Sequence, residues 1–525
     1  MPAFKSNSSL SFLSLTLGRS VGMVLAAAAL ALASPSSPAQ LDLKAWDGTL
    51  GGAVRVRVEG APGTKFLLFF SAKPGPIPLA WVDPSDRRVL SLGTDLLWLT
   101  QLGFLGPSGA VGFALPVPKD PFLAGLTLRT QALSWPGKGR IFGDLSPLGG
   151  VHLWSRGTWE PLSARLPMPR IYARAFSFPG KGVLLAGGGT GAMLALVAGK
   201  ESFWFDPVGR SFQKGPSMNQ ARGLFGAAFL KDGRVLLAGG VDRLNDPQNT
   251  LEIFDPKAGR FLPLSARMRH KRSIHTATLL AGGKVLLAGG ISDMNGQLKA
   301  LGSVVKSTDL FDPGTGKILA GPDMAYPRAA HFALPLPGGK VLLGGGVSWK
   351  WVVFLKVPFV TKTTEVFDPS TGKISPGPSM KVARGFCSTI RLKDGRFLLV
   401  GGGTGDVTSL GAPTATCEIY DPAKGTFTLT GSLAQARAMA ALFLLPDGRV
   451  LAAGGVKGNL FSPLSLSSTE IYDPVKGTWS PGPAMGKARA GGAECLLPDG
   501  TFLLAGGVGG GQSGAAQSSL EVFHP

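Results

Sequence analysis

The feature that most constrains this chain is a unit of about fifty residues that recurs seven times after Gly150. Each unit contains a short apolar run followed by a Gly-Gly pair, and an arginine lies eighteen residues before the second glycine. The second glycines lie 50 to 56 residues apart. They are Gly188, Gly240, Gly290, Gly346, Gly402, Gly455 and Gly507.

The parts of one unit predict four antiparallel strands. Leu-Leu-Ala before the glycines is apolar throughout, which is typical of a strand buried on both faces. Turns such as Lys-Asp-Gly-Arg at 231–234 join it to the preceding strand, and a Glu-Ile-Tyr strand and an Asp-Pro turn follow. Because one such sheet cannot bury both of its faces alone, the sheets are expected to stack radially as blades.

This unit resembles the kelch repeat, the blade unit also found in the central domain of galactose oxidase. The resemblance rests on the Gly-Gly pairs, on the Tyr or Phe before Asp-Pro, and on an aromatic residue in the fourth strand. It implies an all-β fold, a seven-bladed kelch-type β-propeller over residues 150–525. The departures are Ile318 and Ile374, where the family favours Trp, and Phe203, where Glu is usual. The fourth-strand aromatic residues include Phe212, Phe261, Phe427 and Trp479.

The last unit ends at Pro525 after its third strand, so its fourth strand is expected from the other end of the repeats. Gly157–Pro161 reads Gly-Thr-Trp-Glu-Pro, and it matches the Gly-Thr-Trp of residues 477–479. A ring closed by strands from both ends leaves no exposed edge. Val151–Trp154 is a second candidate for the third strand of this blade and competes with Leu520–Phe523.

The residues before the repeats divide into a targeting segment and a small domain. Residues 1–33 have a positive start, an apolar run from Val21 and small residues at Ala31 and Ala33, which predicts a signal peptide cleaved after Ala33. The alternative is a membrane anchor, but the run is shorter than the roughly 20 residues of a span. We therefore expect a secreted or periplasmic protein. Residues 41–148 alternate in polarity with Gly and Pro between the runs, which predicts a small β-sandwich-like domain.

Composition limits the partners. The formal net charge is +21 although charged residues are only 16% of the chain, so an anionic partner is favoured. The cations are scattered, so we expect no nucleic-acid partner. Three cysteines without a Cys-x-x-Cys pair indicate neither a disulfide scaffold nor a zinc site. We expect no metal, no cofactor and no membrane span, and the sequence does not define the oligomeric state.

The constant spacing of the arginines within the repeats makes them the first candidate binding residues. If each begins a blade, the guanidinium groups ring one face and bind a carboxylate or sulfate. The alternative is that each arginine is a structural residue of the repeat. The seven candidates are Arg170, Arg222, Arg272, Arg328, Arg384, Arg437 and Arg489.

A second candidate is an apolar loop in the fourth unit. Residues 349–360 read WKWVVFLKVPFV, where the other units carry polar loops. Exposed apolar patches of this kind mark interaction sites. One interpretation is a hairpin docked on the N-terminal domain, which protects it from water. The other is a partner or ligand contact through Trp349, Trp351 and Phe354.

Two catalytic interpretations are weaker. Gly187–Ala192 matches the pattern of a dinucleotide loop, but the same glycines recur in six other units. The resemblance to galactose oxidase implies a copper-radical site of two Tyr, two His and a Cys linked to one Tyr. The sequence offers no Tyr-His pair, and Tyr420 and Tyr472 occupy the aromatic position before Asp-Pro.

We therefore expect a binding scaffold for an anionic glycan or a protein partner rather than an enzyme. The alternative is a sugar-modifying enzyme at the channel mouth, such as an acidic-sugar epimerase or a carbohydrate oxidase-like protein. A carboxylate or histidine in the channel with a perturbed pKa is the feature that would favour the enzyme.

Overall fold

The computed structural model divides into an N-terminal unit that ends at Arg156 and a propeller unit that begins at Gly157. In the propeller unit the structure describes residues 157–192, 195–405, 411–458, 463–509 and 514–525. In the N-terminal unit it describes strands β1 to β9, Leu105 and Ser155. The signal peptide expected at residues 1–33 lies outside the described residues.

The N-terminal unit contains antiparallel sheets. One has the order β1-β2-β7 and another the order β6-β3-β8-β9, while β4 pairs with β5. Val56 and Val58 are buried and Arg57 between them is exposed, as alternation along a strand predicts. The strands are β1 (Asp42–Trp46), β2 (Ala53–Glu59), β3 (Lys65–Ser71), β4 (Pro74–Pro78), β5 (Val89–Leu92), β6 (Gln101–Phe104), β7 (Ala110–Pro116), β8 (Thr127–Ser134) and β9 (Gly149–His152).

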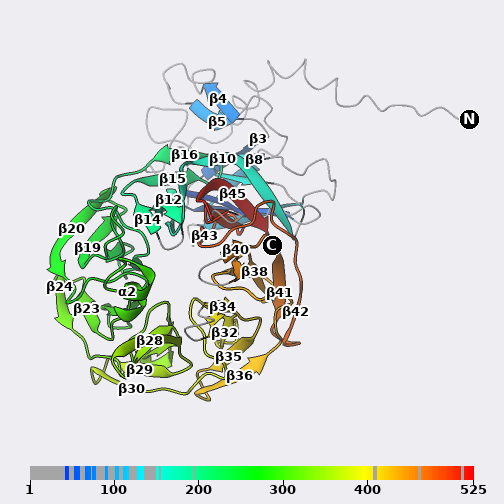
Figure 1. Ribbon diagram of the computed structural model, residues 1–525. Helices are drawn as coiled ribbons and strands as arrows, with labels where there is room; N and C mark the ends of the chain where they lie inside the picture. Colours follow the sequence, from blue (N-terminus) through cyan, green and yellow to red (C-terminus); the bar gives the residue numbers. More distant parts are fainter. Residues whose placement is uncertain are drawn as a thin grey trace, which may run out of the picture. The chain divides into compact units, whose positions relative to one another are not determined.

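The propeller unit is a ring of seven four-stranded antiparallel sheets (Figure 1), which confirms the predicted fold class. Six blades are continuous in sequence. The first two are β11 (Arg174–Phe178), β12 (Gly182–Ala186), β15 (Ser202–Asp206) and β16 (Ser211–Lys214), then β17 (Gly226–Phe229), β18 (Val235–Ala238), β19 (Thr250–Asp255) and β20 (Arg260–Arg267). The third and fourth are β21 (Thr276–Leu279), β22 (Val285–Ala288), β23 (Thr308–Asp312) and β24 (Lys317–Ala320), then β25 (Phe332–Pro335), β26 (Val341–Gly344), β29 (Thr364–Asp368) and β30 (Lys373–Pro376). The fifth and sixth are β31 (Ser388–Arg391), β32 (Phe397–Val400), β35 (Cys417–Asp421) and β36 (Thr426–Thr430), then β37 (Ala441–Leu444), β38 (Val450–Ala453), β41 (Thr469–Asp473) and β42 (Thr478–Pro481).

The seventh blade closes the ring with strands from both ends of the repeats. It consists of β43 (Ala493–Leu496), β44 (Phe502–Ala505), β45 (Gln517–His524) and β10 (Thr158–Arg170). Trp159 pairs with Phe523, and their ring centroids lie 5.1 Å apart. The predicted closure through Trp159 is therefore present. Of the two candidate third strands, residues 520–523 occupy the position, because β9 pairs with β8 in the N-terminal unit.

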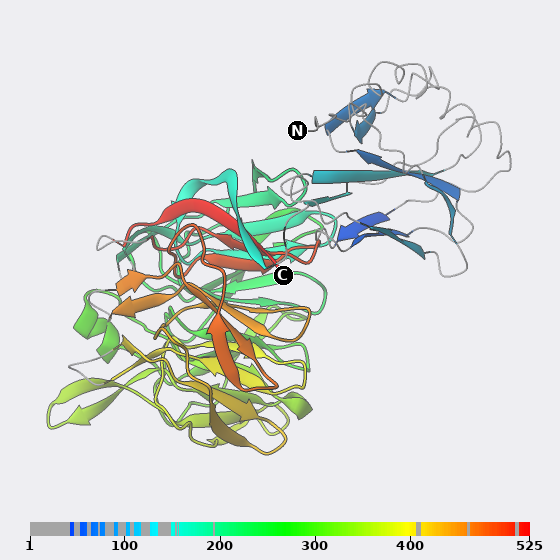
Figure 2. The same ribbon diagram turned by 90° about the vertical axis from the view of Figure 1, so that its right-hand side faces the viewer.

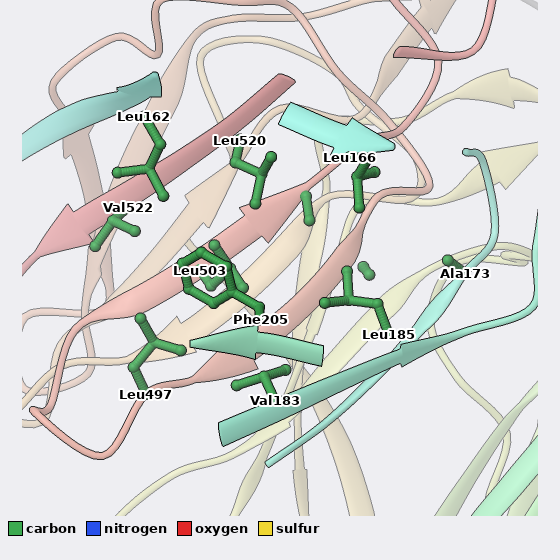
Figure 3. Close-up of a cluster of buried hydrophobic side chains, with 12 residues drawn as sticks. Leu162, Leu166, Ala173, Val183, Leu185, Phe205, Leu497, Leu503, Leu520 and Val522 are labelled. Carbon is green, nitrogen blue, oxygen red and sulfur yellow. The ribbon is translucent and has the colours of Figure 1, made fainter. Parts of the chain in front are cut away.

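The core is divided into layers between neighbouring blades. The second strand of each blade is buried along its length, apart from Gly182 at the start of β12, as its apolar sequence predicts. One cluster of buried side chains lies at every blade interface. At the closing interface, Leu503 and Val522 of the last blade pack near Val183 and Phe205 of the first (Figure 3).

The Gly-Gly pairs hold the blades to one another. The N–H of each second glycine donates a hydrogen bond of 2.7–2.9 Å to the carbonyl of the arginine that begins the next blade. Gly507 donates to Arg170 and so completes the circle. At Gly240 the backbone has φ +85°, and a Cβ would lie 2.5 Å from the Gly223 carbonyl oxygen. Only glycine meets both conditions without displacing the neighbouring strand.

Within the part of the chain that the structure describes, four blades carry a small extra hairpin between the second and third strands, and the third blade carries α2 (Gln297–Gly302) in that place. The hairpin β27 (Val347–Val352)–β28 (Leu355–Val360) projects beyond the blades beside α2 (Figure 2). Within the described residues, no helix has the length and hydropathy to cross a bilayer. The remaining small elements are β13 (Gly189–Ala192), β14 (Ala195–Ala198), β33 (Gly403–Thr404), β34 (Ala412–Pro413), β39 (Val456–Gly458), β40 (Pro463–Ser465) and the 3₁₀ turn η3 (Pro337–Gly339).

Replacing Gly240 by Ala should destabilise the propeller, because the new Cβ meets a backbone oxygen of its own blade. Gly233 is the matched control, since it has φ +84° but open space around a Cβ. Both variants bear the cost of a left-handed residue, and Gly240→Ala should lose about 1–3 kcal/mol more from overpacking. Chemical denaturation measures the difference. Equal losses in the two variants would show that the close approach is unimportant.

Candidate functional site in the central channel

The seven arginines predicted as binding residues are buried inside their blades, with 0–3% of each residue exposed. Arg222 shows the pattern. Its Nη1 donates to the carbonyls of Gly239 and Thr250 at 2.8 and 3.0 Å, and its Nε donates to Glu252 at 2.6 Å. Six of the seven guanidinium groups make such a pair of carbonyl contacts and so tie the second strand of the blade to the third. Arg170 contacts Glu201 and the Met168 sulfur instead.

Each arginine also has a carboxylate partner within 3.0 Å. In the first blade, where Phe203 occupies the usual Glu position, Glu201 supplies the carboxylate and the Arg170 guanidinium lies 5.9 Å from the Phe203 ring. Glu252 also accepts the backbone N–H of Asn219, in the segment that enters the blade. The partners are Glu201, Glu252, Asp309, Glu365, Glu418, Glu470 and Glu521.

These contacts are those of a structural residue. Burial lowers the pKa of Arg222, and the nearby Glu252 acts in the opposite direction. A guanidinium whose donors already bind carbonyls and a carboxylate has little left to offer a ligand. Anion binding by the arginine ring stays a prediction, and the geometry gives its support to the alternative of a repeat scaffold.

The structure places the other predicted residues apart from the arginines. Trp349 and Trp351 lie on β27 and Phe354 lies in the turn that follows. Trp349 is half-buried and donates from Nε1 to the Val304 carbonyl at 3.0 Å. Trp351 and Phe354 are exposed. This hairpin and the arginines therefore do not form one site.

Two residues after each arginine, the chain forms a collar around the propeller axis. All seven collar residues have φ between 51° and 60°, although six of them are not glycine. Backbone hydrogen bonds join five of the seven neighbouring pairs, such as Ile274 N–H to Leu224 carbonyl at 2.9 Å and Tyr172 N–H to Gly491 carbonyl at 2.8 Å. The collar residues are Tyr172, Leu224, Ile274, Ala330, Phe386, Met439 and Gly491.

Next to the collar, the first strands of the blades enclose two adjoining cavities of about 230 and 410 Å³. The larger cavity is lined mainly by small side chains of the first strands, including Ala175, Ala227 and Ala277. Arg174 and Glu494 line both cavities. Because small residues leave the space open, these two charged side chains dominate its chemistry.

Arg174 and Glu494 belong to the first strands of adjacent blades, β11 and β43. Solvent reaches both side chains, yet the surrounding channel wall restricts how much water hydrates them. This desolvation raises the pKa of Glu494 to about 7, and the charge of Arg174 acts in the opposite direction. The same desolvation lowers the pKa of Arg174, opposed by Glu494. Their main chains pair within the blade sheets, but neither side chain has a hydrogen bond or ion pair with another described residue.

His275 also lines the larger cavity. Burial lowers its pKa far below the ordinary value, with Arg272 contributing, and neither ring nitrogen has a hydrogen-bond partner among the described residues. His331 sits at the equivalent place in the next blade, and burial lowers its pKa to about 3. Both imidazoles are therefore neutral, and they pack against Gly239 and Gly289 of the preceding blades.

Neither charged channel residue, Arg174 or Glu494, was expected from the sequence. The signal was available in the repeats, because the fifth residue after each arginine is Ala175, Ala227, Ala277 and Ala333 in the first four blades but Glu494 in the last. Where one blade has a charged residue at a position that is small in other blades, the fold does not require that side chain.

Comparisons with known proteins agree with this architecture. The kelch-motif family model matches residues 444–486, which cover most of the sixth blade. The seven blades built on that unit show that the chain contains a kelch-type β-propeller. Spermatocyte protein spe-26 of Caenorhabditis elegans is 28% identical over 137 residues, which are 25% of this chain and 22% of that protein.

Among solved structures, a fungal alcohol oxidase of the AA5 family in complex with copper is similar to this chain. It matches with a TM-score of 0.55 and 18% identity, over 70% of this chain and 76% of its own. At this identity the likeness shows the fold alone.

The side chains of this propeller do not fit the copper site implied by the oxidase resemblance. Among the described residues, no three His, Cys, Asp or Glu side chains come together as metal ligands. Tyr172 packs over Gly491 in the collar, and Tyr420 and Tyr472 are buried in the blades. Cys387, Cys417 and Cys495 are free thiols. We therefore derive no copper chemistry for this chain.

Replacing Arg222 by Ala should cost about 3–5 kcal/mol of stability, because the buried Glu252 carboxylate is left without a neighbouring cation. Arg234→Ala is the matched control, since its pair with Asp232 is exposed and should contribute about 0–1 kcal/mol. Replacing both Arg222 and Glu252 by Met should recover part of the loss. Denaturant unfolding measures all three, and a fully stable Arg222→Ala protein contradicts the structural role.

Stability should also depend on Glu494. Its folded pKa of about 7 lies above the ordinary value of 4.5, so the folded chain retains a proton that the unfolded chain loses. Stability should therefore fall as the pH rises from about 4.5 to about 7. Glu494→Gln should not show this pH-dependent loss of stability. Its stability relative to wild type should therefore increase as the pH rises across that range. Thermal melts at about pH 5 and about pH 8 test the sign. Asp323→Asn is the control, because Asp323 is exposed and lies outside the two cavities.

Proposed function

We propose that this protein is a binding scaffold that holds a small anionic ligand, a carboxylated or sulfated sugar, in its central channel. The observation that carries the proposal is Arg174, whose guanidinium lines the cavity without a hydrogen bond or ion pair to the described residues. Kelch-type propellers provide the scaffold, and the partner is inferred from the chemistry of the channel.

The size and lining of the cavity fit such a ligand. Its volume of about 410 Å³ lies within the roughly 300–1,000 Å³ of small-molecule sites. Thr276 and Thr278 add hydroxyl groups to the wall, which suit the hydroxyls of a sugar. The guanidinium offers a planar pair of donors to a carboxylate or sulfate.

Glu494 determines when the channel is cationic. Below a pH of about 7 its carboxyl is protonated, so Arg174 acts alone and a protonated carboxyl is available as a donor. Above that pH the carboxylate offsets the arginine charge. An anionic ligand is therefore expected to bind more tightly at mildly acidic pH.

Secretion belongs to the same proposal. The signal expected at residues 1–33 would deliver the protein to a compartment where acidic glycans of a cell envelope are available. The net charge of +21 would attract such polymers over a distance of about 10 Å at 0.1 M salt.

A second candidate function is acid–base catalysis on the same sugar. Glu494 favours it, because a carboxyl with a pKa near 7 can both donate and accept a proton at neutral pH. A binding protein returns the ligand unchanged. An epimerase or related enzyme converts it, and nuclear magnetic resonance of the incubated ligand distinguishes the two.

Replacing Arg174 by Gln should weaken binding of the ligand by about 1.5–3 kcal/mol, the contribution of a charged hydrogen bond. The probes are oligogalacturonate and a sulfated disaccharide, chosen after a glycan array read at low and high salt. Calorimetric titration of the full chain at mildly acidic pH gives the affinity.

Arg260→Gln is the matched control, because Arg260 is an exposed arginine on the outer strand β20. It removes the same charge and should leave the affinity unchanged. Equal weakening by the two variants would show that only the overall charge matters. Unchanged binding in Arg174→Gln would rule out the channel site.

A further inference from the structure

The tip of the β27–β28 hairpin exposes five consecutive apolar residues to solvent. The exposed fractions from Trp351 to Leu355 are 61, 44, 82, 88 and 72%. Successive residues of a strand point to opposite faces, so Trp351 and Val352 place apolar surface on both faces of the hairpin. A water-exposed segment of this composition requires an apolar partner.

The base of the hairpin is fixed to the propeller. Val347 and Val360 are buried and pack with Leu301. Trp349 donates to the Val304 carbonyl at 3.0 Å, and the Lys356 ammonium donates to the Gly302 carbonyl at 2.9 Å. The tip is therefore held away from the blades (Figure 2).

The turn at the tip contains apolar residues that are unfavourable for the conformation of the turn. Val352 pairs with Leu355, so Val353 and Phe354 form a two-residue connection. Such connections favour Asn and Gly, which accept positive φ. Here Val353 has φ 55°, a conformation that a β-branched residue adopts at a cost. Apolar surface is present at the tip at the expense of turn stability.

Cations surround the apolar tip. Lys350 and Lys356 flank it on the hairpin and are exposed, and the exposed Lys299 lies on the adjacent α2. The Lys356 ammonium lies 4.1 Å from the Trp349 ring centroid and 5.7 Å from that of Trp351. Residues 324–364 contain no Asp or Glu. The hairpin thus carries apolar residues at its tip, with two tryptophans and two lysines at the level of Trp349 to Trp351.

We propose that this hairpin inserts its tip into the surface of a lipid membrane that carries anionic headgroups. Tryptophan rings occupy the level of the headgroups, and lysines next to a membrane gain about 1 kcal/mol each from anionic lipids. A protein groove covers one face of a hairpin, whereas the acyl layer surrounds both faces. The exposure of both faces therefore favours lipid. This proposal is independent of the channel ligand.

Vesicle flotation of the full chain tests it. The chain should float with vesicles of phosphatidylcholine containing phosphatidylglycerol and bind less to phosphatidylcholine alone. The double variant Trp351→Ser/Phe354→Ser should lose roughly a hundred-fold in partitioning, since each large apolar side chain contributes about ten-fold. Its melting temperature should match wild type because both side chains are exposed.

The matched control is Leu244→Ser/Val475→Ser, which removes two side chains that are 83 and 94% exposed on other surfaces. It should float as wild type does. Equal loss in control and tip variants, or full binding by the tip variant, would show that the net charge alone attracts the vesicles and would overturn the proposal. Absence of wild-type flotation would overturn it too. The proposal would also be overturned if sedimentation showed a dimer that depends on the tip, or if the tip captured another protein, and vesicles did not displace that partner.

Discussion

The fold depends on one repeated arrangement, in which an arginine joins two levels of structure at once. In six of the seven blades its guanidinium ties the second and third strands of its own blade. In all seven its main-chain carbonyl accepts the N–H of the second glycine of the preceding blade. A buried guanidinium is acceptable because a carboxylate and several carbonyls satisfy it. The pairing of strands within a blade and the contact between neighbouring blades are therefore coupled through one residue.

The geometry of the channel follows from that coupling. Two residues beyond each arginine, the chain turns into the left-handed region and forms the collar. Hydrogen bonds between neighbouring collar residues set the spacing of the first strands. Once this spacing is fixed by main-chain contacts, side chains on the channel wall are free to vary without loss of the fold. The scaffold thus separates structural positions from positions available for binding.

This separation explains what the sequence could predict. The number of blades, their strand order and the closure through Trp159 rest on residues that recur at a fixed spacing, and these expectations are confirmed. The third strand of the closing blade was ambiguous, because Val151 and Leu520 are both in short apolar runs. It is decided by pairing between residues 159 and 523, a contact too distant in sequence for local pattern to show.

The arginines and the channel charges illustrate opposite errors of interpretation. Regular spacing drew attention to the seven arginines, but regularity is what a structural role produces. All seven are buried and paired with a carboxylate, and the Nε groups without a partner among the described residues are buried too. Arg174 and Glu494 show no spacing, because each occurs in one blade only at a position that is small or uncharged in others. A seven-fold ring of identical residues cannot orient an asymmetric ligand. One cation and one titratable carboxyl on adjacent blades remove that symmetry, so recognition in this propeller is expected where a unit departs from the repeat. The apolar hairpin of the fourth blade is a second departure of the same kind, on a part of the molecule that the ring of hydrogen bonds leaves unconstrained.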